Sequence, residues 1–152
     1  MARFVYRMQS VLNIKQQTEN QTKMEFGVAQ AELNEQLDIL QEYIKRKENY
    51  LIEAEELRKA TSLKLQDILD NQYATAQMDV FIKQQMRVVE QYEQRVEQVR
   101  VRLTRNIQER KMQETLRDRA FAEFLEEQKQ EEAKENDQRT SFTYGQRQKE
   151  DT

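Results

Sequence analysis

Acidic side chains are the most abundant groups in this sequence that could do chemistry. The 152 residues include 28 aspartates and glutamates, and two carboxylates can catalyse proton transfer when a cleft separates their pKa values. The chain has no histidine and no cysteine, which removes the imidazole base, the thiol nucleophile, disulfides and the usual zinc ligands. We therefore interpret the carboxylates as a solvated charged surface, and we expect neither an enzyme nor a cofactor.

Basic side chains are concentrated between Lys83 and Arg119. Ten lysines and arginines in this stretch could follow a nucleic-acid backbone, but six acidic residues lie among them. Glutamates such as Glu90 and Glu97 can neutralise the arginines as flanking pairs on a helix. Since the net charge is -3, the whole chain does not attract phosphate groups. We expect no nucleic-acid partner, whereas the acidic surface of a protein partner stays open.

The chain as a whole is predicted to be helical. Proline is absent, glycine occurs twice and charged residues make up 35% of the sequence, while the good helix formers Glu, Gln, Lys, Arg and Leu are abundant. No apolar run exceeds three residues, although a membrane-spanning helix needs about 20 and the core of a signal peptide about 7. We expect an all-α protein without a membrane span or export signal, located in the cytoplasm unless a partner holds it elsewhere.

Two stretches show the heptad pattern of helices that pack along one apolar stripe. In the first, one predicted row contains Phe26, Leu33, Leu40, Lys47, Ala54, Thr61 and Ile68, and a second row follows it by four residues, at Gln30, Leu37, Ile44, Leu51, Arg58, Leu65 and Gln72. In the second stretch, Ile82, Val89, Val96 and Leu103 alternate with Gln85, Tyr92, Val99 and Asn106. Both patterns indicate left-handed coiled-coil packing.

The pattern lapses at residues 69–79, where Asp70, Asn71 and Thr75 could form a turn or cap a helix. The sequence therefore predicts a long, stalk-like antiparallel two-helix coiled coil, an α-hairpin, over residues 1–138. Helix one would span about residues 3–69, the turn about 70–77 and helix two about 78–138, followed by a disordered polar tail at 139–152. One long helix in a parallel dimer is the alternative.

A turn near residue 74 would pair residues whose numbers sum to about 148. Val11 and Leu12 would then face Asn136 and Asp137, in an acidic segment with no apolar partner to offer. This leaves five apolar residues without a partner in their own chain: Phe4, Val5, Met8, Val11 and Leu12. An uncovered apolar surface is commonly an interaction site. We favour docking to a partner protein, with self-association and contact with a membrane surface as alternatives.

Three segments resemble the flagellar FliJ protein family. They are "FVYRMQSVLNIKQQTE" at residues 4–19, "LNEQLDILQEY" at 33–43, and "ERKMQETLRDRAFAEF" at 109–124 with the following "EEAKENDQ" at 131–138. Each segment is weakly specific, but together they occur in the family's order and spacing over about residues 3–138. The resemblance implies a non-enzymatic, stalk-like coiled coil of the flagellar type III export apparatus.

The resemblance also implies partners and binding residues. The partners are the hexameric export ATPase, the cytoplasmic domain of the membrane export gate, and export chaperones. The terminal end, with Phe4, Val5, Met8, Val11 and Leu12, would bind the ATPase. The gate-binding residues would be Gln36, Leu40, Tyr43, Phe81, Val88 and Tyr92. The protein would then be cytoplasmic and would meet the membrane only indirectly, through the export apparatus at the flagellar base.

Overall fold

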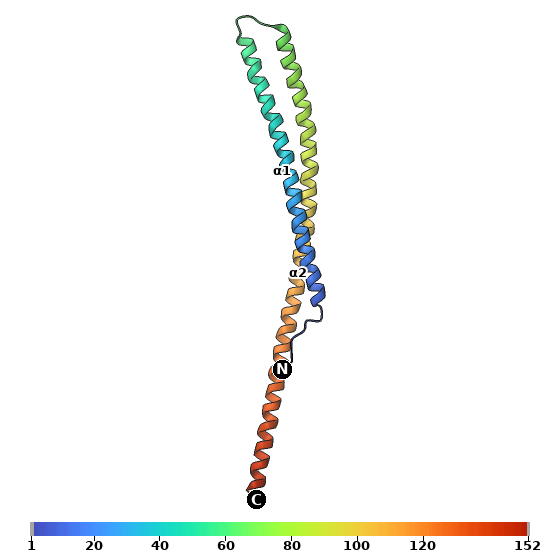
Figure 1. The fold of residues 1–152 in the computed structure, drawn as a ribbon, viewed down its shortest axis with the longest axis vertical. Helices are drawn as coiled ribbons and strands as arrows, with labels where there is room; N and C mark the ends of the chain where they lie inside the picture. The colour runs from blue at the N-terminus through green and yellow to red at the C-terminus, as the bar shows by residue number, and fades with distance from the viewer. Residues whose placement is uncertain (1, 152) are drawn as a thin grey trace. The chain divides into compact units, whose positions relative to one another are not determined.

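The computed structural model describes residues 2–151 and contains two long α-helices (Figure 1). Helix α1 spans Gln9–Lys59 and helix α2 spans Leu65–Glu150, with no strand among the described residues. The two helices pack against each other as a helical hairpin. The predicted all-α hairpin is confirmed, and the alternative of one continuous helix is wrong.

The helices contact each other within two compact units. The loop unit comprises residues 20–105, and the terminal unit comprises the residues up to 19 together with those from 106 onward. Each unit therefore contains part of α1 and part of α2, and each is described separately below.

The residues of α1 that face α2 form a regular heptad pattern. Buried and half-buried positions alternate at spacings of three and four along the helix, as a and d positions do in a coiled coil. The positions that follow this spacing are Leu12, Lys15, Glu19, Thr22, Phe26, Ala29, Leu33, Gln36, Leu40, Tyr43, Lys47, Tyr50, Ala54 and Leu57. We assign Phe26 and Leu33 to position a, and Ala29 and Gln36 to position d.

Helix α2 has a matching pattern, which includes all eight positions predicted for it between Ile82 and Asn106. The buried and half-buried residues at its a and d positions are Ile68, Asn71, Thr75, Met78, Ile82, Gln85, Val89, Tyr92, Val96, Val99, Leu103, Asn106, Arg110 and Gln113. In α1, by contrast, only one of the two predicted rows is correct. The second row follows the first by three residues, not four, so Leu37, Ile44 and Leu51 are exposed.

The connection between the helices lies at residues 60–64, about ten residues before the predicted turn at 70–77. Its Thr61 and Ser62 are poor helix formers whose hydroxyls compete for backbone groups. Arg58 and Lys59 in the last turn of α1, and Asp67 in the first turn of α2, suit the helix dipoles on either side. The predicted turn boundaries are therefore wrong.

The polar residues that suggested a turn have other roles inside α2. The Asn71 amide Nδ2 donates a hydrogen bond of 2.9 Å to the backbone carbonyl of Tyr50 in α1. The Thr75 hydroxyl donates to the carbonyl of Asn71, one turn earlier in its own helix. Because both side chains are satisfied within the helical structure, they do not end the helix.

The earlier loop changes which residues face each other. A loop centred near residue 62 pairs residues whose numbers sum to about 124, as Tyr43 and Phe81 do in the loop unit. In the terminal unit, Lys15 pairs with Glu109. The predicted sum of 148 is wrong, and so are the pairings derived from it, including Val11 and Leu12 opposite the acidic segment.

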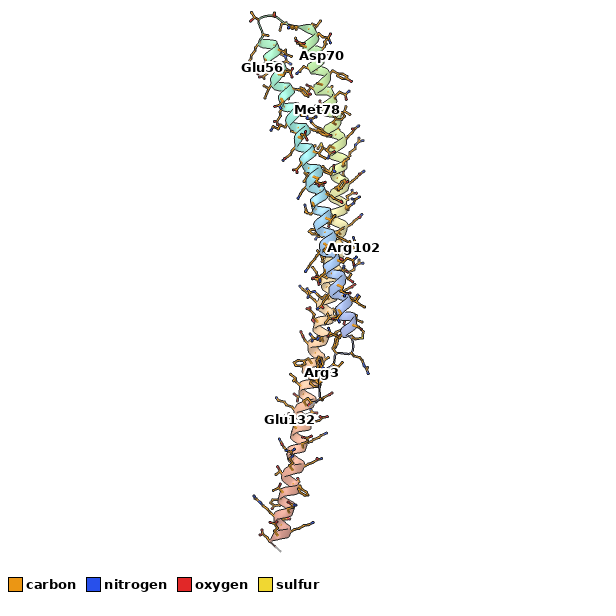
Figure 2. The ribbon with its side chains drawn as sticks, in the orientation of Figure 1. Arg3, Glu56, Asp70, Met78, Arg102 and Glu132 are labelled. Carbon is orange, nitrogen blue, oxygen red and sulfur yellow. The ribbon has the colours of Figure 1, made fainter. Side chains whose placement is uncertain are left out.

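The end of the chain also differs from the prediction. Residues 139–150, expected to be disordered, continue α2 as far as Glu150. All described side chains from Lys129 onward are exposed. Figure 2 shows the side chains around Glu132 projecting from α2 past the position of Arg3. The absence of proline in this polar segment leaves its helix propensity intact.

Neither helix has a stretch apolar enough to cross a membrane, as far as residues 2–151 show.

Candidate partner-binding surfaces

The terminal unit contains an aromatic cluster built from two distant parts of the chain. Residues 2–8 precede α1 and are not helical, and they place the Phe4 ring against two rings of α2. The ring centroid of Phe4 lies 5.1 Å from that of Phe121, at an interplanar angle of 69°, and 5.4 Å from that of Phe124. Edge-to-face contacts of this kind add to the stabilisation from buried area. The cluster anchors the N-terminal segment on α2.

The five residues predicted to bind the ATPase fall into two groups. Leu12 is only 1% exposed, and Phe4 and Val11 are half-buried. Val5 is 78% exposed, and Met8 is exposed as well. The expectation that this apolar stretch has no partner in its own chain is therefore wrong, because α2 covers one side of it. Val5 and Met8 remain available to another molecule.

Exposed apolar side chains also occur on the α2 side of the terminal unit. Phe121 and Leu125 are about half exposed. A shallow groove runs beside the N-terminal segment and is lined by Arg3, Phe4, Val5, Tyr6, Gln9 and Arg117. The terminal unit thus presents an apolar surface made of both chain segments, with arginines beside it.

Charged groups hold the next turns of the terminal unit together. The Arg110 guanidinium donates hydrogen bonds to the buried Glu19 carboxylate of α1 and, at 2.9 Å, to Glu114 of its own helix. These bonds, first that to Glu114 and then that to Glu19, raise the pKa of Arg110. Lys15 bonds Glu109 at 2.8 Å. The network fixes the register between the helices. It pairs Lys15 and Glu19 with Glu109 and Arg110, which the predicted sum of 148 did not place opposite them.

In the loop unit, the structure brings together some of the residues predicted to bind the gate. The ring centroids of Tyr43 and Phe81 lie 5.9 Å apart, so α1 and α2 form one aromatic pair. Phe81 is 44% exposed, while Tyr43 and Val88 are half-buried. These three residues can form part of one surface.

The other predicted gate residues have structural roles between the helices. The Gln85 amide donates to the backbone carbonyl and to the side-chain oxygen of Gln36, at 2.9 and 2.8 Å. Leu40 and Tyr92 occupy half-buried core positions, and the Arg95 guanidinium lies 5.0 Å from the centre of the Tyr92 ring. Gln36, Leu40 and Tyr92 therefore contribute mainly to packing, with only their partly exposed edges open to a partner.

One edge of the loop unit is closed by ion pairs between heptad g positions. Arg95 bonds Glu32 at 3.1 Å and Arg102 bonds Glu25 at 2.9 Å. Ile39 lies one heptad after Glu32 and so belongs to the g row of α1. Phe81 and Val88 belong to the g row of α2. Sequence reasoning missed Ile39 because it placed the second core row of α1 one residue too late. We call this side, with both g rows, the g edge.

The opposite side of the loop unit, the e edge, has a different character. Leu37, Ile44 and Leu51 form the e row of α1 and are 37–49% exposed. A groove of about 270 Å³ lies at the loop end of this edge, between α1 and α2. Sequence reasoning had these three residues in the core and so assigned them no binding role.

Among residues 2–151, no cluster of three or more acidic side chains has the arrangement of a metal site.

Comparison with known proteins gives one match. A family model described as Flagellar FliJ protein matches residues 4–149, which is nearly the whole chain. No curated protein and no solved structure matches the chain.

Proposed function

The chain belongs to the flagellar FliJ family of export apparatus components, and from this premise we propose that it links the export ATPase to the export gate. It would act without catalysis, as a coiled coil on the cytoplasmic side of the membrane at the flagellar base. The terminal unit would bind the ATPase ring, the g edge of the loop unit would bind the cytoplasmic domain of the gate, and export chaperones would be a third class of partner.

The observation that carries the ATPase proposal is the division within the N-terminal segment. Phe4 fixes the segment on α2, and Leu12 is buried just after it in α1, while Val5 and Met8 remain exposed. Exposed apolar side chains on a rigid support suit a protein interface, because little conformational entropy is lost on binding. The half-exposed Phe121 and Leu125 would extend the same interface onto α2.

The ATPase proposal can be tested without disturbing the fold. The variant with Val5→Gln and Met8→Gln changes exposed side chains only, so we expect an unchanged melting temperature and loss of ATPase capture in a pull-down. Val28→Gln in the loop unit alters another exposed apolar residue and should leave capture intact. Full capture by the double variant would refute this site.

Removing residues 1–14 is a second test with a different expected result. The deletion removes Phe4 and Leu12 as well, so it should abolish ATPase capture and also loosen the terminal unit. The helices should persist, because most of α1 lies beyond the deletion. Helicity measured by circular dichroism separates this outcome from global unfolding.

The gate proposal depends on the aromatic pair of Tyr43 and Phe81 at the g edge. We expect alanine substitution of Tyr43, Phe81 and Val88 together to abolish binding of the purified gate domain, measured by calorimetry. Ile52→Ala, at an exposed position away from both edges, is the control. Unchanged gate affinity of the triple variant would remove this surface from the proposal.

A further inference from the structure

The e row of α1 departs from the usual composition of a flanking row in a coiled coil. In a two-stranded coiled coil, the e and g positions are usually charged. The g edge follows this rule at its two ion pairs and is apolar at Phe81 and Val88, whereas the e row of α1 has Leu37, Ile44 and Leu51 at successive heptads. Apolar residues at a, d and e together are typical of a helix that packs against two neighbours. Helix α1 has only one neighbour in the loop unit.

The space for a second neighbour is present at the e edge. The groove of about 270 Å³ is lined by e-row residues of both helices, among them Leu51 and Gln72, and by the small core residues Ala54 and Thr75. Within the loop unit, Figure 1 shows the two helices further apart toward the loop than in the middle of their contact. Small side chains leave the core underfilled there, so an apolar side chain from outside would complete the packing.

Carboxylates surround this apolar row. Glu48 and Glu55 lie four residues after Ile44 and Leu51, on the same face of α1, and Glu90 and Glu93 follow the exposed Met86 on α2. All four are exposed. None of them has an ion-pair partner within the described part of the chain.

Basic groups in these rows are few by comparison. They are Arg58, Lys83 and Arg100, set against the four glutamates, Asp79 and Glu97, and Arg100 is paired with Glu97. Asp79 is already paired with Lys47 at 2.6 Å. On the g edge, Glu25 and Glu32 are likewise paired with arginines of α2, whereas Glu53 has no ion-pair partner within the described part of the chain. The e edge therefore combines an apolar row with four glutamates that are not neutralised from within.

We propose that the e edge of the loop unit, centred on Ile44, Leu51 and the adjoining groove, binds a basic amphipathic helix of a partner protein. The apolar face of that helix would lie on the Leu37, Ile44 and Leu51 row, and its lysines or arginines would face the four unpaired glutamates. This is the helix-in-groove mode of recognition, in which apolar residues at helical spacing act as anchors. The surface is separate from the terminal unit and from the g edge.

Two synthetic peptides of about three heptads test the proposal by fluorescence anisotropy with the full chain. Both have leucine at their a and d positions. One has lysine at the flanking positions and the other has glutamate. We expect the lysine peptide to bind and the glutamate peptide to bind at least about tenfold more weakly, because like charges would face each other. Equal binding of the two peptides would overturn the charge complementarity.

Matched variants locate the site. The change of Ile44→Gln with Leu51→Gln should weaken binding of the lysine peptide at least about tenfold, while Ile52→Gln, a neighbouring residue that is 57% exposed, should not. Glu48→Lys with Glu55→Lys should weaken binding too, and Glu35→Lys, on another face of α1, should not. Circular dichroism checks that the exposed substitutions keep the helices. If the Ile44→Gln, Leu51→Gln variant binds the lysine peptide as tightly as the wild type does, the proposed site is refuted.

A second copy of the chain is the competing occupant. Sedimentation equilibrium distinguishes it: we expect the same monomer mass for the wild type and for the Ile44→Gln, Leu51→Gln variant. A wild-type dimer that this variant converts to a monomer would replace the partner helix with a second copy and overturn the proposal. Alanine substitution of Phe81, on the g edge, should not affect binding of the lysine peptide. The e edge can therefore be tested whether or not the gate binds the g edge.

Discussion

In the terminal unit, the segment before α1 packs an aromatic ring against α2, whereas in the loop unit the two helices contact each other directly, through aliphatic and amide side chains and one aromatic pair. The terminal unit depends on Phe4 against Phe121 and Phe124, on buried Leu12 and on the bond between Glu19 and Arg110. The loop unit buries Leu33, Val89 and Val99, with Gln85 and Asn71 bonded across the interface.

This comparison shows how one heptad pattern can support two kinds of packing. In the terminal unit, α1 contributes few residues, so a small number of large contacts must hold them on α2. Single substitutions there should have large local effects. Where the helices run together for many turns, each contact contributes a smaller share. The four predictions below test this difference, from the largest expected effect to the smallest.

The largest effect is expected for Leu12→Ala. Leu12 is the most deeply buried large side chain among the described residues, and its truncation leaves a cavity that typically lowers the free energy of unfolding by about 3 kcal/mol. Amide hydrogen exchange should show faster opening of the terminal unit with little change in the loop unit. Equal acceleration in both units would contradict the difference between them.

Arg110→Met should have the next largest effect. The substitution removes the guanidinium from the buried carboxylate of Glu19, and a buried charge that loses its partner is costly. We expect lower stability in urea, with an effect between those of Leu12→Ala and Gln85→Ala. The double variant with Glu19→Gln should recover part of the loss, and additive effects of the two changes would argue against direct coupling.

Gln85→Ala tests the amide contacts of the loop unit. The change removes two hydrogen bonds to Gln36, and the expected loss is about 1 kcal/mol, typical of a side-chain hydrogen bond. Urea denaturation measures it. Exchange should increase near residues 36 and 85 and not in the terminal unit, and a loss as large as that of Leu12→Ala would remove the contrast.

The smallest effect is expected for Arg95→Ala. Its ion pair with Glu32 is more than 40% exposed on both sides, so solvent screens it and the loss should be about 0.5 kcal/mol or less. High salt should reduce even this difference. A larger loss that persists in salt would indicate that the stacking of Arg95 on Tyr92 matters more than the ion pair.

The sequence supports the helical fold well, but it locates the loop poorly. Continuous helix-forming composition predicts two long helices, and apolar periodicity finds the core row of α2 from Ile82 to Asn106. The sequence predicts the turn at Asp70, Asn71 and Thr75, because such residues commonly cap helices. In the structure they bond within the helical hairpin, at Tyr50 and Asn71, while the less conspicuous Thr61 and Ser62 lie in the loop.

An error of ten residues in the loop changes every pairing, and this affected the candidate sites most. It made Leu12 appear uncovered, and it hid the contact of Phe4 with Phe121. The choice of a spacing of four instead of three in α1 placed Leu37, Ile44 and Leu51 in the core, since these residues are more apolar than the actual row of Gln36, Tyr43 and Tyr50. Periodicity alone favours the more apolar row.

The amino-acid sequence by itself determined that this protein is a pair of long helices with a heptad core and no cysteine or histidine chemistry, because helix propensity and periodicity are local properties. The tertiary structure alone decided which residues face each other, which apolar residues remain exposed and which charges are paired. Those features depend on the register between two distant segments, and that register is set by contacts such as Phe4 with Phe121 and Gln85 with Gln36.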